Sequence, residues 1–196
     1  MRASLLVLGF LLCWPLPARA EWQIQPFVGL TFGGDTTLVN LSQDAGERRA
    51  VVGINGRLLG EVFGIEGDVG HTSGFFGDEG LIVKSGVTTI TANVIVGLPR
   101  EWMRYTLRPY LVAGGGVIRV RADDFLGVLP LDSRLNAFDV GGGATGFLND
   151  RVGLSWELRY FRSVGRGNRG VSFGEEQLSF WRATMALVIR LDRGSR

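Results

Sequence analysis

The sequence predicts an all-β protein, an eight-stranded antiparallel up-and-down transmembrane β-barrel. Three observations support this fold class. The chain contains eight runs of about 10 to 14 residues in which side chains alternate in character with a period of two, as in the strands of membrane barrels. The segments between these runs are alternately long and polar or short, like the loops and turns of such a barrel. The two faces of the predicted strands also differ in residue content.

The predicted strands lie near residues 22–32, 49–59, 61–73, 87–98, 105–121, 135–148, 151–163 and 178–191. Long segments follow the first, third, fifth and seventh strands, at 33–48, 74–86, 122–134 and 164–177. Short links follow the second, fourth and sixth strands, at residue 60, residues 99–104 and residues 149–150. Both ends of the barrel chain are therefore expected on the rim that carries the short links.

Residues 1–20 have the layout of a secretory signal peptide, with Arg2 before an apolar run and the sequence ARA at 18–20. We expect the mature barrel domain to cover residues 21–196. The two arginines of the leader account for the formal net charge of +2, so the mature chain offers no charge argument for nucleic-acid binding. The single cysteine, Cys13, lies in the leader, which leaves neither a disulfide nor a thiolate metal site in the mature chain.

One face of the predicted strands is apolar and the other is charged. The apolar face comprises Trp22, Ile24, Val28, Leu30, Phe32, Phe63, Ile65, Val69, Ile90, Val94, Val96, Leu98, Tyr110, Val112, Ile118, Val120, Trp181, Met185, Leu187, Ile189 and Leu191. The other face carries, among small residues, Arg57, Glu66, Asp68, Asn93, Arg119, Arg121, Asp139, Glu157, Arg159, Arg182 and Arg190. In the seventh strand, Trp156 belongs to the apolar face and Glu157 to the charged face.

Alternation alone leaves the direction of these faces open. A membrane barrel puts its apolar face outside against lipid, whereas a lipocalin-like periplasmic carrier puts it inside around a ligand. The single lysine of the chain, Lys84, lies in a predicted long segment, and the charged face has arginine instead. We favour the membrane barrel because arginine and carboxylate form fixed pairs that suit a crowded interior. The predicted structural ion-pair network of the lumen comprises Arg57, Glu66, Asp68, Arg119, Asp139, Glu157, Arg159, Arg182 and Arg190.

Four stretches of the chain resemble a known family. They are FGIEGDVG at 63–70, RPYLVAGGGV at 108–117, FDVGGGATGFL at 138–148 and VGLSWELRYF at 152–161. Together they resemble the small outer-membrane β-barrel proteins of the OmpA-like and OmpX-like kind. The resemblance implies an eight-stranded barrel in the outer membrane of a Gram-negative bacterium, and it implies no single activity. Members commonly end in an aromatic residue, whereas this chain ends in LDRGSR at 191–196, so the register of the last strand stays open.

His71 and Ser73 form the one candidate catalytic pair, with Glu79 a few residues later. A histidine, a hydroxyl and a carboxylate together can activate the hydroxyl for acyl transfer. An outer-membrane lipid A deacylase family uses a His-x-Ser pair with a later glutamate on the outer face of a barrel. Here Gly74 follows the serine and the pair lies in the third predicted strand, which departs from that family. We therefore predict no catalytic residues and no enzymatic activity, and the lipid A deacylase-type hydrolase stays as an alternative.

The last long segment contains RSVGRGNRGV, in which Arg162, Arg166 and Arg169 are placed to contact phosphates of lipopolysaccharide or acidic host polymers. The aspartates of the third long segment lack the spacing of a calcium loop. The glycine-rich stretch GGGATG at 141–146 continues into another strand rather than into the helix that a dinucleotide site needs. We predict neither a metal site nor a cofactor.

These observations predict a non-enzymatic outer-membrane protein whose long surface loops act in envelope integrity or in surface interaction and adhesion, because binding residues often sit on loops held by a rigid scaffold. Eight strands leave room inside only for side chains, so a diffusion porin is not expected. The expected partners are outer-membrane lipids and lipopolysaccharide, the barrel assembly machinery, and a host or surface ligand bound through the loops. Nucleic acid is not an expected partner.

Overall fold

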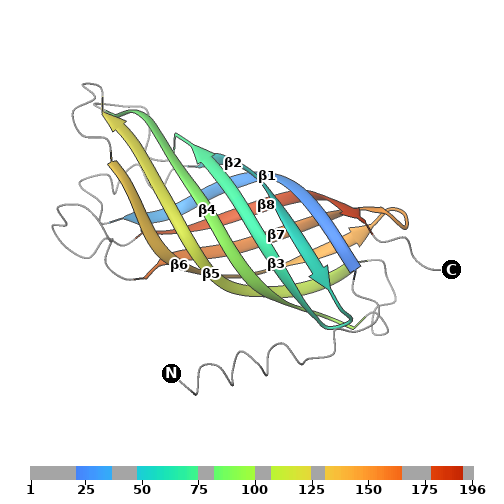
Figure 1. Ribbon diagram of the computed structural model, residues 1–196. Helices are drawn as coiled ribbons and strands as arrows, with labels where there is room; N and C mark the ends of the chain where they lie inside the picture. The colour runs from blue at the N-terminus through green and yellow to red at the C-terminus, as the bar shows by residue number, and fades with distance from the viewer. Residues whose placement is uncertain are drawn as a thin grey trace, which may run out of the picture.

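The computed structural model describes residues 21–36, 48–74, 82–99, 107–124, 131–164 and 178–191, which form a closed antiparallel barrel (Figure 1). The strands are β1 Glu21–Thr36, β2 Arg49–Leu59, β3 Phe63–Ser73, β4 Ile82–Gly97, β5 Leu107–Asp124, β6 Leu131–Phe147, β7 Val152–Ser163 and β8 Leu178–Arg190. Each strand pairs with the next, and β8 pairs with β1 to close the barrel. In these ranges no helix is long and apolar enough to cross a membrane.

The two ends of the barrel differ in how the strands are joined. At one end, which we call the turn end, short links join β2 to β3 and β6 to β7, and β1 starts and β8 stops there (Figure 1). The β6–β7 link is held by Asn149, whose Oδ1 accepts hydrogen bonds from the backbone N–H groups of Arg151 and Val152 at 2.9 and 2.8 Å. At the other end, which we call the loop end, the longer segments of the chain leave the barrel.

All eight predicted strands are present, and four of them extend further at the loop end than the sequence predicted. β1 reaches Thr36, β4 begins at Ile82, β5 continues to Asp124 and β6 begins at Leu131. The prediction that 122–134 is a long loop was therefore wrong in part, because both of its ends belong to strands and Ala122 pairs with Leu131, while residues 125–130 lie outside the described residues. At the loop end, the strands stay paired but lose the apolar alternation that marks a lipid-facing strand. Because the strand prediction was based on that alternation, it could not detect these extensions.

The register of β8 is defined by its pairing on both sides. Trp156 of β7 lies opposite Met185, and β1 pairs with β8 along most of its length. A β-bulge between Phe32 and Asp35 interrupts that pairing near the loop end, where Gly33 has a φ of 60°, in the left-handed region that favours glycine. The pairing on both sides gives the register of β8, which the sequence left open.

The outer face of the barrel is apolar and its inner face carries the charges, as predicted for a transmembrane barrel. Large hydrophobic side chains stay exposed on the outside of every strand, including Trp22, Val28, Val52, Phe63, Ile90, Leu111, Val140, Trp156 and Met185. In β7, Trp156 is 44% exposed, whereas its neighbours Ser155 and Glu157 are 2% and 8% exposed. A lipocalin-like carrier would need the reverse arrangement, so that alternative is wrong.

The face prediction was wrong in one strand, β5. Tyr110, Val112, Ile118 and Val120, predicted to face lipid, are all buried in the lumen. Their neighbour Arg119, predicted to face the lumen, lies on the outer face, and so does Arg121, which is exposed. β5 has apolar residues on both faces, so its alternation does not show which face points to lipid. The prediction was based on the assumption that its arginines point into the lumen.

Apolar side chains also fill the lumen near both ends of the barrel. The loop-end cluster consists of Val87, Ile118, Val120, Leu135, Ala137, Phe161, Leu178 and Phe180. A smaller cluster near the turn end contains Ile95, Tyr110 and Val112. The charged residues therefore lie between two apolar layers, which keep water from the ion pairs and explain why the inner face of β5 is apolar.

Candidate functional site

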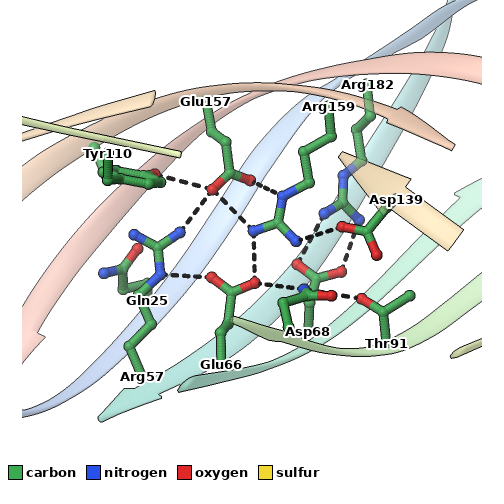
Figure 2. Close-up of polar contacts among 12 residues, drawn as sticks. Gln25, Arg57, Glu66, Asp68, Thr91, Tyr110, Asp139, Glu157, Arg159 and Arg182 are labelled. Atoms are coloured by element: carbon green, nitrogen blue, oxygen red, sulfur yellow. Dashed lines mark hydrogen bonds and ion pairs between the residues drawn. The ribbon is translucent and has the colours of Figure 1, made fainter. Parts of the chain in front are cut away.

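The middle of the lumen holds a group of buried charged side chains from five strands, which we call the central network (Figure 2). Its members are Arg57 of β2, Glu66 and Asp68 of β3, Asp139 of β6, Glu157 and Arg159 of β7, and Arg182 of β8. Each occupies an inward position of its strand, because alternate side chains of a strand point to the same face. The three arginines are at most 1% exposed. Charges buried to this extent need partners, since an unpaired buried charge is very costly.

Two arginines and two glutamates form a closed ring of ion pairs at the centre of this network. Arg57 donates from Nε to Glu66 Oε2 at 2.5 Å and from Nη2 to Glu157 Oε2 at 2.7 Å. Arg159 donates from Nη2 to Glu66 Oε1 at 2.6 Å and from Nε to Glu157 Oε1 at 2.5 Å. Positive and negative groups alternate around the ring, as Figure 2 shows. The ring connects β2 and β3 to β7 across the lumen.

A second ion pair lies toward the loop end and connects β8 to β3. Arg182 binds Asp68 with two parallel hydrogen bonds, from Nη1 at 2.9 Å and from Nη2 at 2.8 Å. Its guanidinium also lies 4.9 Å from the ring centre of Phe27 and 4.7 Å from that of Phe161. Both the two-pronged geometry and the aromatic contacts suit arginine and not lysine.

Neutral polar side chains complete the hydrogen bonding of the two glutamates. The Nδ2 group of Asn93 donates to Glu66 Oε1 at 2.8 Å. The hydroxyl of Tyr110 donates to Glu157 Oε2 at 2.9 Å, and its ring lies 4.5 Å from the guanidinium of Arg57. Tyr110 was missed as a lumen residue because its strand was assigned the wrong face. A signal was present in the sequence, since the glycine-rich stretch of β6 lies directly opposite and leaves space for a large ring.

Glycines on the inner face make room for the central network. A Cβ atom at Gly143 would lie 2.7 Å from the Tyr110 hydroxyl oxygen, and one at Gly70 would lie 2.7 Å from Arg182 Nη1. A Cβ atom at Gly141 would lie 2.8 Å from Cγ of Arg159. The stretch GGGATG, which continues along β6, thus provides space beside bulky lumen residues.

Two residues of the predicted lumen network lie outside the central network, Arg190 on the inward face of β8 and Arg119 on the outer face of β5. Arg190 is at the turn end, where it pairs with Glu21 and lies 3.6 Å from the ring centre of Phe147. Arg119 lies on the outer face of β5, between the buried residues Ile118 and Val120, so its placement in the lumen was wrong. The remaining seven predicted residues are those of the central network.

The candidate catalytic pair lies on the outer face of β3. His71 and Ser73 are both exposed, and His71 Nδ1 lies 2.9 Å from Oγ1 of Thr88 on β4. Glu79, the proposed third member, falls outside the described residues. The structure therefore places the two side chains on one face near the loop end, with the imidazole in contact with a threonine.

The predicted phosphate contacts lie at or beyond the end of β7. Arg162 is exposed near the end of this strand, whereas Arg166 and Arg169 fall outside the described residues. Within the described part of the chain, no group of three or more His, Cys, Asp or Glu side chains is arranged to hold a metal ion.

No protein-family model matches the chain, and no curated protein sequence matches it. Solved structures do. Neisserial surface protein A (NspA) matches with a TM-score of 0.61 at 15% identity, covering 85% of this chain and 96% of that chain. The N-terminal β-barrel domain of Pseudomonas aeruginosa OprF matches with a TM-score of 0.54 at 12% identity, over 88% and 100%. Yersinia pestis Ail, the attachment invasion locus protein, solved with the heparin analogue sucrose octasulfate, matches with a TM-score of 0.51 at 12% identity, over 87% and 99%.

At these identities the likeness establishes the fold alone. It agrees with the closed eight-stranded topology of this chain. This chain has the fold of the small eight-stranded outer-membrane β-barrels.

Proposed function

We propose that this protein is a non-enzymatic barrel of the outer membrane that presents the segments between its strands at the cell surface, where they act in envelope integrity or in surface interaction and adhesion. The observation that carries the proposal is the filled lumen, in which ion pairs join opposite walls. A barrel of eight strands has room inside only for side chains. The barrel is then a scaffold rather than a pore, and binding falls to the segments outside it.

The central network has a structural role in this proposal. Arg57, Arg159 and Arg182 each bind a carboxylate from another strand, so the network acts as a set of cross-links between walls. The pair of Arg190 with Glu21 does the same between the first and last strands at the turn end. A stiff barrel of this kind suits a protein whose segments at the loop end must be held in place.

The ligands that we propose for the loop end are anionic. Arg162 is exposed at the end of β7, and Arg166 and Arg169 follow in the next segment. One protein of the same fold, Ail, was solved with a sulfated heparin analogue. We therefore propose lipopolysaccharide phosphates and acidic host polymers as partners, beside the membrane lipids and the barrel assembly machinery that any such barrel needs.

Heparin binding by intact cells tests the surface part of this proposal. Cells that express the protein should retain heparin-coated beads, and the double substitution Arg166→Gln with Arg169→Gln should reduce retention several-fold. Arg151→Gln at the turn end is the matched control, because it removes one arginine from the opposite rim. Equal losses in both variants, or no retention by the wild type, would contradict a role in binding acidic polymers.

Conductance in a planar bilayer tests the scaffold part. The purified, folded protein should give no stable ion-conducting channel, because the central network fills the lumen. Unboiled protein should also migrate differently from boiled protein in a gel, as a folded barrel does. A steady channel formed by the folded protein would overturn the scaffold and favour a pore.

A lipid A deacylase is the second candidate, because His71 and Ser73 share an exposed outer face near the loop end. Mass spectrometry of lipid A from cells with and without the protein separates the two candidates. We expect lipid A to be unchanged. Loss of one acyl chain that disappears in the Ser73→Ala variant would establish the enzyme instead.

A further inference from the structure

Arginines gather on the outer wall formed by β5, β6 and β7, close to the loop end. Arg134 and Arg162 are exposed on β6 and β7, and Arg119 lies on the outer face of β5. The sequence pattern assigned Arg119 to the lumen. The outer cluster therefore became visible only when the structure showed which residues of β5 face outward. Arginine at the edge of an apolar belt lies at the depth of lipid headgroups.

Arg119 and Arg134 lie directly opposite each other in the β5–β6 pairing. Opposite residues on one face have Cβ atoms about 4.5 to 5.5 Å apart. Arg134 is the exposed member of this pair, whereas Arg119 is only partly exposed, so Arg134 is the cation that the site uses. Arg121 is the next outward arginine on β5, but Asp132 lies opposite it in the pairing, so we leave it out of the site.

An apolar groove runs along the same wall. It is lined by Val140, Gly141 and Gly142 of β6, Leu158 and Tyr160 of β7, and Trp181 of β8. The missing side chain at Gly142, which faces outward next to Leu111, forms its floor, and the rings of Tyr160 and Trp181, whose centres are 5.1 Å apart, form one side. In Figure 1 these three strands lie next to one another along the barrel. A slot of this shape accepts a flexible hydrocarbon chain.

The next outward position of β7 beyond the groove lining is an arginine. Tyr160 lies opposite Val140, and Arg162, two residues further along the same face of β7, lies opposite Phe138. Arg134 is four residues beyond Phe138 on β6, a distance of about 13 Å along a strand. The wall therefore carries two cationic positions, one at the end of the groove and one further toward the loop end.

We infer that this wall binds a phosphorylated acyl glycolipid of the outer leaflet, the lipid A part of lipopolysaccharide. Lipid A is a disaccharide with a phosphate at each end and several acyl chains. One acyl chain lies in the groove, one phosphate contacts Arg162, and the other contacts Arg134. The inference rests on the proposed function only in placing the loop end at the cell surface.

Native mass spectrometry of the protein folded in detergent tests this inference with purified lipid A as the probe. We expect one lipid A to bind. Arg134→Gln and Arg162→Gln should each weaken binding about fivefold, and the double variant about 25-fold, since an arginine near anionic lipid contributes on the order of this factor. Arg151→Gln at the turn end should leave binding unchanged. Equal losses with Arg151→Gln, or none in the double variant, would overturn the site.

The probe itself separates the lipid from a simple anion. Lipid A without its phosphates should bind the wild-type protein weakly. The loss should equal the loss that Arg134→Gln with Arg162→Gln causes for normal lipid A. Inorganic phosphate at millimolar concentration should not displace lipid A. Displacement by inorganic phosphate would show an anion site without a role for the groove, and that outcome contradicts the inference.

Filling the groove tests the acyl chain. Val140→Trp places an indole in the slot and should reduce lipid A binding in the wild-type background, whereas Ile54→Trp on the outer face of β2 should not. Both positions are about half exposed, at 48% and 49%, so both variants should fold. Unchanged binding in Val140→Trp would overturn the groove as the acyl site. The lipid A experiments change residues of the strands, whereas the heparin experiment changes Arg166 and Arg169 between β7 and β8. The two proposals can therefore fail independently.

Discussion

The lumen and the outer wall both contain arginine, but the surroundings of the side chain differ. In the lumen, Arg159 is 0% exposed and binds three carboxylates, those of Glu66, Asp139 and Glu157. On the outer wall, Arg162 lies three residues further along the same strand and is exposed. A buried arginine that loses its partners is strongly destabilising, whereas an exposed one contributes little. The comparison teaches that burial and partners, rather than residue type, decide what an arginine does in this barrel.

Removing the central arginine should have the largest effect. Arg159→Met keeps a long side chain but removes the cation that three buried carboxylates share. Asp139 loses its arginine, and Glu66 and Glu157 keep only Arg57. We therefore expect the free energy of unfolding to fall by about 3 to 5 kcal/mol. Urea unfolding in lipid vesicles, followed by tryptophan fluorescence, measures this. Arg162→Met on the outer face of the same strand is the control. If the two variants lost similar stability, the distinction between lumen and wall would fail.

Placing an arginine on the lipid-facing side should have the next largest effect. Trp156→Arg puts a charge into the middle of the apolar belt and should cost about 2 to 4 kcal/mol. Ser155→Arg, one residue away, should be destabilising for a different reason, because it overpacks the space beside Tyr110 and Thr145. Quenching by lipid-borne quenchers should reach a label at 156 and not one at 155. The opposite result would invert the faces of β7.

Removing one hydroxyl from the lumen should have a smaller effect. Tyr110→Phe deletes the hydrogen bond to Glu157 and should cost about 1 to 3 kcal/mol, because a buried charged acceptor loses a donor. Tyr160→Phe on the outer face is the matched control and should be close to neutral. Gel mobility after incubation in increasing urea compares the two. Equal midpoints would mean that the hydroxyl of Tyr110 contributes nothing to the network.

The smallest effect is expected at the rim. Arg162→Gln should change the free energy of unfolding by no more than about 0.5 kcal/mol, as is usual for exposed positions. The same variant should weaken lipid A binding, so stability and binding separate at this residue. A large loss of stability in Arg162→Gln would show that this arginine belongs to the fold rather than to a binding surface.

All seven members of the central network could be predicted from the sequence, because they lie at alternate positions of clear strands. In β7 the pattern placed Glu157 and Arg159 inside and Trp156 outside, as the structure has them. Arg119 and Tyr110 were assigned to the wrong faces, since β5 is apolar on both sides over much of its length. Near the loop end, the lumen beside β5 is lined by the apolar side chains of the loop-end cluster, which come from several strands. The sequence of β5 alone therefore could not show that its inner face is apolar.

The sequence by itself determined the number of strands, their order and, in every strand except β5, the face that meets lipid. Alternation along one strand is a local property, and the residue content of the two faces gave their direction. Only the tertiary structure decided which charges meet. Arg182 and Asp68 are 114 positions apart in the chain, and Arg57 and Glu157 are 100 apart. These partners come together only when the barrel closes and excludes water, because the register of every strand pair then sets which inward side chains share a level of the lumen.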